Sequence, residues 1–176
     1  MAISIKALRS AATRNRQAFV AKSLNEALTK SQQTAFLCHS HQDQELAKGL
    51  QNILNEHGWK VYIDWLDEGL PTSPDKETAE KIKLKIKQTD WFLFLATPNS
   101  TSSRWCPWEI GYADAVKNHE KILMIPTIDD NGRWHGNEYL QIYNSISDAS
   151  NQITNKSGYA VFHPGTTKNG KWIEDL

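Results

Sequence analysis

Residues 91–113 read WFLFLATPNSTSSRWCPWEIGYA and place a strand, a polar loop and a helix start in direct succession. The run 91–95 is apolar throughout, which is typical of a strand buried on both faces of a sheet. The loop 96–103 leads to a helix that we expect over residues 106–118. Pro107 supports that start, because the N–H that proline lacks would have no intrahelical partner in a first turn.

The same succession occurs earlier in the chain. The short apolar run 35–38 is followed by the polar residues 39–43. Four apolar residues then recur at i, i+4, i+7 and i+8 from Leu46, which predicts one apolar stripe on a helix that Gly58 ends. A second strand follows at 59–63.

Two further units complete the pattern. Residues 64–74 contain Gly and Pro among acids and hydroxyls and predict an exposed loop, long for an α/β connection. Apolar residues at 79, 82 and 86 indicate a lysine-rich helix, and 122–126 reads as a fourth strand. Strand and helix therefore alternate four times, which predicts an α/β fold with a doubly wound parallel sheet. Beyond 129 the pattern weakens: 139–153 is ambiguous, and 158–162 could be a fifth strand.

Composition narrows the classes of function. A chain of 176 residues with 39% hydrophobic residues can bury the core of one domain. The formal net charge is zero, so no overall basic field points to nucleic acid or to an acidic membrane surface. No apolar run approaches the roughly 20 residues of a membrane span. Cys38 and Cys106 form neither a disulfide framework nor a zinc-type pair, and we expect a cytosolic protein.

Residues 1–33 differ from the rest of the chain. This segment contains six basic residues and one acidic residue, which gives a formal charge of +5. We expect an N-terminal helical extension that packs Ile5, Leu8, Val20, Leu24 and Leu28 on its own domain or on a sister subunit. An organellar transit segment has a similar composition and is the alternative. The predicted domain then covers residues 34–176, with its best-supported part at 34–126.

The expected topology selects the loops where a ligand would bind. Ligands of open parallel sheets bind beyond the carboxyl ends of the strands, where the winding direction reverses. If the first strand lies between the second and the third, this point falls between the loops 39–43 and 97–103. The second of these loops leads directly to Glu109, close to the N-terminus of the predicted helix.

Glu109 has a position that suits chemistry at an N-glycosidic bond. The helix dipole favours a negative charge there, so we expect an ionised carboxylate at neutral pH. Such a group stabilises the positive charge that develops on ribose when this bond breaks. The same spacing also fits an acid that only stabilises a first helical turn, by a few tenths of a kcal/mol. Trp105 and Trp108 are likewise compatible with core packing.

Several motifs in order resemble those of TIR domains, which have a flavodoxin-like sheet. The stretch 36–43, FLCHSHQD, is similar to the first-strand motif, and 57–64, HGWKVYID, to the second strand. Residues 64–74 then correspond to the BB loop, and TPNS at 97–100 to the family's SPNS. The stretch 103–113, SRWCPWEIGYA, is close to the family's S-x-W-C-x-x-E-x-x-x-A and is the most specific of these matches.

The resemblance implies an activity and a site. Many TIR domains are NAD⁺ glycohydrolases, and their essential glutamate corresponds to Glu109. The family implies that the NAD⁺ pocket is lined by residues of the first loop, the BB loop and the W-x-x-x-E motif: His39, Ser40, His41, Trp65, Leu70 and Trp105.

The resemblance also implies the reaction. NAD⁺ would be the substrate, with no cofactor and no metal. The products are ADP-ribose or a cyclic ADP-ribose isomer, often an immune signal in phage defence that a downstream effector senses. Self-association through TIR–TIR contacts is also implied.

Two departures from the family pattern concern the loops around the site. Cys38-His39 stands where the family usually has Ser-Tyr, and Gly69-Leu70-Pro71 replaces the common Pro-Gly pair of the BB loop. They leave the identity of the product open. The cluster of Cys38, His39 and His41 lacks a fourth ligand and the spacing of a zinc site, so no metal centre is expected.

Two other classes of function remain as alternatives. One is a TIR adaptor that only docks other TIR domains, although an adaptor has no need for a carboxylate at position 109. The other is an enzyme similar to nucleoside deoxyribosyltransferases, which share the fold type and use a glutamate at an N-glycosidic bond. Cleavage of a nucleoside without activity on NAD⁺ would favour the latter.

Overall fold

The computed structural model describes all residues except 1, 15–23, 64–75 and 136–137. Its α-helices are α1 (Ile5–Ala12), α2 (Leu24–Thr29), α3 (Gln44–Glu56), α4 (Lys76–Gln88), α5 (Pro98–Ser102) and α6 (Cys106–Val116). Its strands are β1 (Ile3–Ser4), β2 (Thr34–Cys38), β3 (Lys60–Tyr62), β4 (Trp91–Ala96), β5 (Ile122–Ile128), β6 (Trp134–His135), β7 (Asn144–Asn151), β8 (Lys156–Phe162) and β9 (Lys171–Trp172). Short 3-10 helices lie at η1 (His41–Asp43), η3 (His119–Lys121), η4 (Glu138–Ile142) and η5 (Ile173–Asp175).

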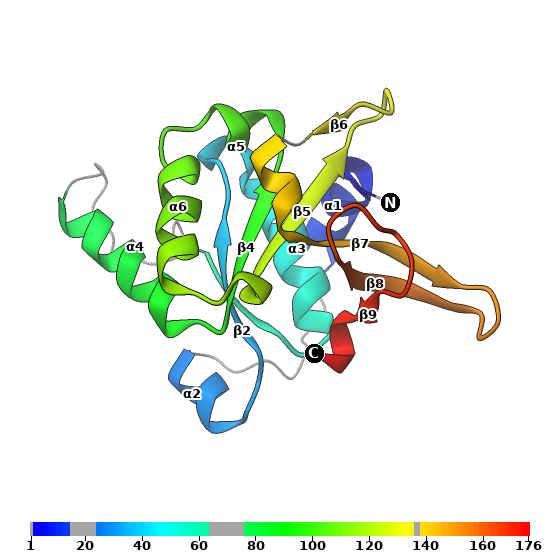
Figure 1. Ribbon diagram of the computed structural model, residues 1–176, viewed down its shortest axis with the longest axis horizontal. Coiled ribbons are helices and arrows are strands. Elements are labelled where there is room, and N and C mark those ends of the chain that lie inside the picture. Colours follow the sequence, from blue (N-terminus) through cyan, green and yellow to red (C-terminus); the bar gives the residue numbers. More distant parts are fainter. Residues whose placement is uncertain (1, 15–23, 64–75, 136–137) are drawn as a thin grey trace.

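The sheet has the order β3-β2-β4-β5-β7-β8-β9, with β1 and β6 paired to β5 (Figure 1). The strands from β3 to β7 run parallel, while β8 and β9 pair antiparallel. The prediction of a doubly wound α/β sheet is therefore confirmed. β2 lies between β3 and β4, as expected for a reversal of winding at this point.

Alternation along the central strands creates two cores, because successive side chains of a strand point to opposite faces. On β2, Ala35 and Leu37 join the core under α1 and α3, whereas Phe36 and Cys38 join the core under α4 and α6. Every residue of β2 and β4 is buried, which accounts for the uninterrupted apolar runs. Helices thus cover both faces of the sheet (Figure 1).

The N-terminal segment is joined to this architecture. β1 pairs in parallel with β5, and α1 packs Leu8, which is fully buried, into the core that α3 also covers. Ile5 packs against the same core. Val20 and the side chains of Leu24 and Leu28 lie outside the described residues. The part of the basic segment that is described therefore contacts its own domain.

Two regions differ from the sequence-based expectation. The loop expected at 96–103 contains the short helix α5, which a capping box formed by Thr97 and Ser100 stabilises. The ambiguous stretch 139–153 contains η4 and β7, and β7 pairs in parallel with β5. The predicted strand at 158–162 exists as part of β8, but it is the antiparallel partner of β7 in a hairpin. No helix of the described part is long and apolar enough to cross a membrane.

Candidate active site

The candidate site lies beyond the carboxyl ends of β2 and β4, as the topology rule predicts. Two segments meet there: residues 39–43 after β2 and residues 97–103 after β4. Asp43 connects them, because its carboxylate accepts hydrogen bonds from the Thr97 hydroxyl and from Asn99 Nδ2, the latter at 2.7 Å. Asp43 is 5% exposed, so these two bonds satisfy a buried carboxylate. The network fixes the two segments relative to each other.

Ser100 reinforces the second segment. Its hydroxyl accepts from the Thr97 N–H at 2.9 Å and donates to the Leu95 carbonyl at 2.7 Å. It is fully buried. Side-chain hydrogen bonds to the backbone therefore stabilise the turn from β4 into α5. This turn determines where the chain begins α6.

Glu109 lies in the first turn of α6, with Pro107 in the same turn as predicted. Its backbone N–H donates to the Trp105 carbonyl at 2.9 Å. The residue is only 4% exposed. An acid that merely counters the helix dipole has no need to leave water, and burial of a carboxylate is unfavourable. The burial of Glu109 therefore favours a chemical role over simple stabilisation of the helix.

A small cavity of about 160 Å³ opens next to Glu109. Its described lining residues are His39, Ser40, His41, Gln42, Thr78, Ile82, Ser103, Trp105 and Glu109. The structure thus brings together the carboxylate and four of the six residues predicted to line the substrate site. The other two, Trp65 and Leu70, lie outside the described residues.

Sequence reasoning missed four lining residues: Gln42, Thr78, Ile82 and Ser103. Thr78 and Ile82 share one face of α4 at a spacing of i and i+4, and this face borders the cavity. Ile82 also belongs to the core under α4 and α6, so its apolar periodicity concealed its second role. Gln42 directly follows the predicted His41, and Ser103 lies two residues before the predicted Trp105.

The environment of His39 determines the roles of its ring nitrogens. The side chain is 8% exposed, and Nδ1 lies 3.1 Å from the Leu37 carbonyl oxygen. Because a carbonyl only accepts, Nδ1 is the nitrogen that carries hydrogen in this bond. In the neutral ring, Nε2 is then the acceptor.

Cys38 lies beneath the site, and its thiol stays protonated. Burial raises the pKa of this thiol well above its usual range, and the hydrogen bond to Cys106 and the negative charge of Glu109 act in the same direction. Its Sγ lies 3.9 Å from the Cys106 carbonyl oxygen. Cys38 is therefore no nucleophile here, and Glu109 has a neutral thiol beside it.

A family model for the TIR domain matches residues 35–154. The chain belongs to the TIR family. The match contains both loops of the candidate site, α6 and Glu109. It also extends past residue 126, where the motif resemblance ended, and includes β7.

Two curated bacterial proteins are similar to this TIR domain. ThsB' of Bacillus cereus (strain MSX-D12), provisionally named a 3' cyclic ADP-D-ribose synthase, is 36% identical over 110 residues, which cover 61% of this chain and 57% of the relative. TIR2 of Cytobacillus dafuensis, provisionally named a cyclic ADP-D-ribose synthase, is 27% identical over 92 residues, or 51% of this chain and 24% of the relative. The chain therefore matches little more than half of the first relative and about a quarter of the second.

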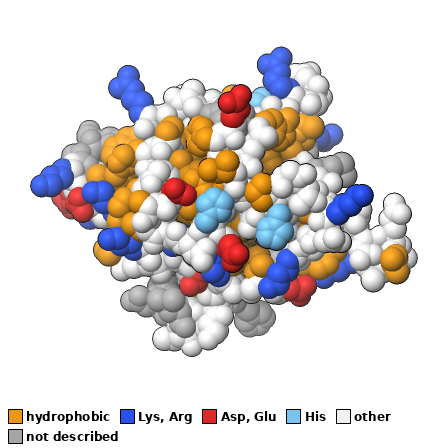
Figure 2. Space-filling model, viewed as in Figure 1, with side chains coloured by type: hydrophobic (Ala, Val, Ile, Leu, Met, Phe, Trp, Pro, Cys, Tyr) orange, Lys and Arg blue, Asp and Glu red, His pale blue; other side chains and the backbone are white. Residues whose placement is uncertain are grey.

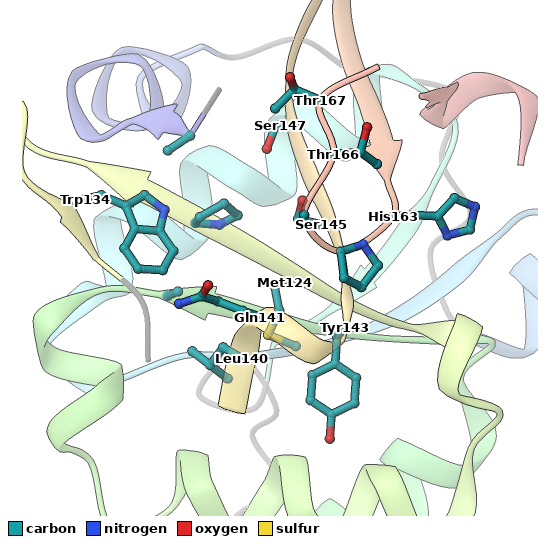
Figure 3. Close-up of a pocket in the computed structure, with 15 residues that line it drawn as sticks. Met124, Trp134, Leu140, Gln141, Tyr143, Ser145, Ser147, His163, Thr166 and Thr167 are labelled. Atoms are coloured by element: carbon teal, nitrogen blue, oxygen red, sulfur yellow. The ribbon is translucent and has the colours of Figure 1, made fainter. Parts of the chain in front are cut away.

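A second hollow of the TIR domain differs in its chemistry. It has about 260 Å³ and lies among β5, β7, η4 and the residues after β8. Ser147, Thr166 and Thr167 lie on one side of it and Met124 and Leu140 on the other (Figure 3). None of its described lining residues is Asp, Glu, Lys or Arg. Its described lining therefore offers no carboxylate that could stabilise a cationic transition state, and the cavity at Glu109 is the better candidate for catalysis.

Among the described residues, no group of three or more His, Cys, Asp or Glu side chains is arranged to hold a metal ion. Among the described residues that line the cavity, His39 and His41 are accompanied by a single carboxylate, that of Glu109. The chemistry available from these side chains is that of a buried carboxylate beside an indole ring, hydroxyls and imidazoles.

Proposed function

We propose that this TIR domain cleaves the nicotinamide–ribose bond of NAD⁺, with Glu109 as the essential carboxylate. The observation that carries the proposal is the burial of Glu109, at 4% exposure, in a cavity at the switch point of the sheet. The names of the two relatives, both cyclic ADP-D-ribose synthases, support it. NAD⁺ enters as the substrate, and the reaction requires neither a metal nor a redox cofactor.

The proposed reaction uses the charge of Glu109. When the N-glycosidic bond breaks, its electron pair leaves with the nicotinamide nitrogen, and the ribose carbon becomes cationic. A carboxylate held next to that carbon stabilises the cation, and the effect is stronger where water is excluded. Water or a group of the same ADP-ribose then forms the new bond to the ribose carbon and loses a proton. The products are nicotinamide and either ADP-ribose or a cyclic isomer.

Trp105 is suited to the leaving group. In NAD⁺ the nicotinamide is a cationic pyridinium ring, and indole is the side chain that binds cations over its face best. Trp105 and Glu109 line the same cavity. We therefore place the pyridinium ring against Trp105 and the ribose toward Glu109, where the carboxylate can also accept hydrogen bonds from ribose hydroxyls. His39, Ser40 and His41 border the same space.

The biological role follows from the family and the product class. We propose that the nucleotide product is an immune signal in bacterial antiphage defence, sensed by a separate effector, and that the domain self-associates through TIR–TIR contacts. The thiols of Cys38 and Cys106 are both buried, which is compatible with a reducing compartment such as the cytosol.

The test is mass-detected liquid chromatography of NAD⁺ incubated with concentrated wild-type protein and with Glu109→Gln. We expect nicotinamide release by the wild type and a loss of about a hundredfold or more in the variant, since it removes the charge but keeps the shape. Glu45→Gln is the matched control, because Glu45 is also a first-turn glutamate but has a side chain 60% exposed. It should retain full activity.

The other outcomes separate the competing functions. Equal activity of wild type and Glu109→Gln would remove Glu109 from the mechanism. A folded wild-type protein that releases no nicotinamide, even when crowded, would favour the adaptor. Cleavage of nucleosides but not of NAD⁺ would favour an enzyme similar to nucleoside deoxyribosyltransferases.

A further inference from the structure

The cavity at Glu109 is too small for a whole dinucleotide. Pockets that enclose a drug-sized ligand have about 300–1,000 Å³, whereas this one has about 160 Å³. Its described lining residues also include no Lys and no Arg. The diphosphate of NAD⁺ carries two negative charges, which proteins usually bind with these two side chains. The described part of the cavity therefore suits the nicotinamide riboside end and leaves the diphosphate to another surface.

Another hollow, distinct from the one beside β7, lies between α4 and α6 and adjoins the cavity at Glu109. It is open, has about 440 Å³, and shares Trp105 with that cavity. It is lined by Lys76, Ala79, Glu80, Lys83, Arg104, Trp105 and Trp108. Hydrophobic and basic side chains lie next to each other on this side of the molecule (Figure 2). Its described lining contains three cationic side chains and one carboxylate, whereas the described lining of the cavity at Glu109 contains no Lys or Arg.

Lys83 and Arg104 are its best-placed cations. Lys83 Nζ is held 3.0 Å from a Glu80 carboxylate oxygen and 5.9 Å from the centre of the Trp108 ring. Arg104 directly precedes Trp105, is exposed, and forms no ion pair with any of the described carboxylates. If the nicotinamide riboside end of NAD⁺ occupies the cavity, the diphosphate extends out of it past Trp105 and lies near these two side chains.

We propose that Lys83 and Arg104 bind the diphosphate of the substrate and that Trp108 supports the adenosine half beyond it. The inference rests on the proposed function, because it assigns the remainder of the same substrate. Trp108 is 36% exposed and packs edge to face on Trp105, with ring centres 5.4 Å apart. The site therefore selects a dinucleotide over nicotinamide riboside, which lacks the charges that Lys83 and Arg104 bind.

Steady-state nicotinamide release tests the assignment. In Arg104→Glu and Lys83→Ala we expect the KM for NAD⁺ to rise about tenfold or more, as for loss of a charge-assisted hydrogen bond. The kcat should change by less than about twofold, because neither side chain contacts the bond that breaks. Arg104→Lys should recover part of the affinity. Lys85→Ala is the matched control: Lys85 is also a lysine of α4, but it lies over Tyr62, 5.0 Å from the ring centre and outside this hollow.

Binding of ADP, measured by calorimetry, provides a readout that needs no turnover. ADP carries the diphosphate without nicotinamide, so its Kd should rise about tenfold or more in Arg104→Glu and stay unchanged in Lys85→Ala. An active wild type whose KM and ADP affinity are the same in Arg104→Glu would overturn this inference and leave the proposed function intact. Loss of kcat at constant KM would also overturn it. A wild type that binds ADP through Arg104 but releases no nicotinamide would instead contradict the proposed function.

Discussion

Two buried carboxylates in neighbouring segments have different roles. Asp43, at 5% exposure, accepts hydrogen bonds from Thr97 and Asn99 and thereby joins the two loops of the site. Glu109, at 4% exposure, lines the cavity itself. The hydrogen bonds of Asp43 that hold the loops together explain its burial by structure alone, whereas Glu109 borders a cavity and is placed to contact a ligand. This difference, invisible in the sequence, separates a positioning residue from a catalytic candidate.

The thiol of Cys38 makes stability depend on pH on the alkaline side. Its pKa is raised mainly by burial, so the folded protein holds the proton more tightly than the unfolded chain does. The contribution is complete below the unfolded pKa of about 8.5 and is lost as pH rises through the folded pKa. We expect the free energy of unfolding to fall by up to about 1.4 kcal/mol per pH unit above pH 8.5 from this group. Urea unfolding at several pH values measures it.

Cys38→Ala provides the comparison. The variant should be less stable overall, because it loses buried volume, but its stability should decline less steeply above pH 8.5. Parallel curves for wild type and variant would show that the thiol does not titrate differently in the two states. The raised pKa of Tyr143, about 12, acts at higher pH and is common to both proteins.

At the scale of elements, the docking of α1 on α3 depends on one glycine. A Cβ added at Gly49 would lie 1.9 Å from the Leu8 carbonyl oxygen, a backbone atom that cannot move alone. Gly49→Ala should therefore destabilise the protein by about 1–3 kcal/mol, as overpacking does. Gly111→Ala is the matched control, since Gly111 also lies within a helix but has nothing within 4 Å of the added Cβ. It should stabilise by up to about 1 kcal/mol.

Thermal or urea unfolding of the two variants decides the question. If Gly49→Ala were as stable as the wild type, the close approach of the helices would be wrong. If it were less stable but Gly111→Ala were too, the loss would reflect the substitution of glycine in general rather than this contact.

The elements that sequence could predict are those whose own residues specify them. β2 from Ala35 onward and the whole of β4 are apolar because both faces of the sheet are covered there. α3 ends where Gly58 adopts a φ of +84°. β7 could not be predicted in this way, since NSISDASN is rich in residues with low strand propensity. It is a strand because it pairs with β8, from Ser145 opposite Phe162 to Asn151 opposite Lys156.

The site shows the same division. His39, Ser40, His41, Trp105 and Glu109 could be named from contiguous motifs, and the structure places them around one cavity. Thr78 enters the site only because α4 packs beside α6, a contact that no local pattern encodes. The cations of the adjoining hollow were likewise hidden, because lysines on a helix surface are usually only solvated.

At the scale of the whole molecule, the arrangement of the site favours cooperation between copies. The described walls of the cavity at Glu109 come from η1, α4 and α6 and from the residues just after β2 and just before α6, and the adjoining hollow is open. The proposed TIR–TIR contacts offer a way to enclose the substrate more fully. Exclusion of water would strengthen the interaction between Glu109 and the cationic ribose.

Activity should therefore rise faster than linearly with protein concentration. A mixing experiment identifies the cause: Glu109→Gln protein, inactive but with its surfaces intact, is added in excess to a dilute wild type. If a neighbouring copy completes the site, the inactive protein will increase nicotinamide release per wild-type molecule, because mass action populates the assembled state. An equal amount of an unrelated protein controls for crowding. Strictly proportional activity with no increase on mixing would mean that each copy acts alone, and the open hollow would then have to bind the substrate without a neighbour.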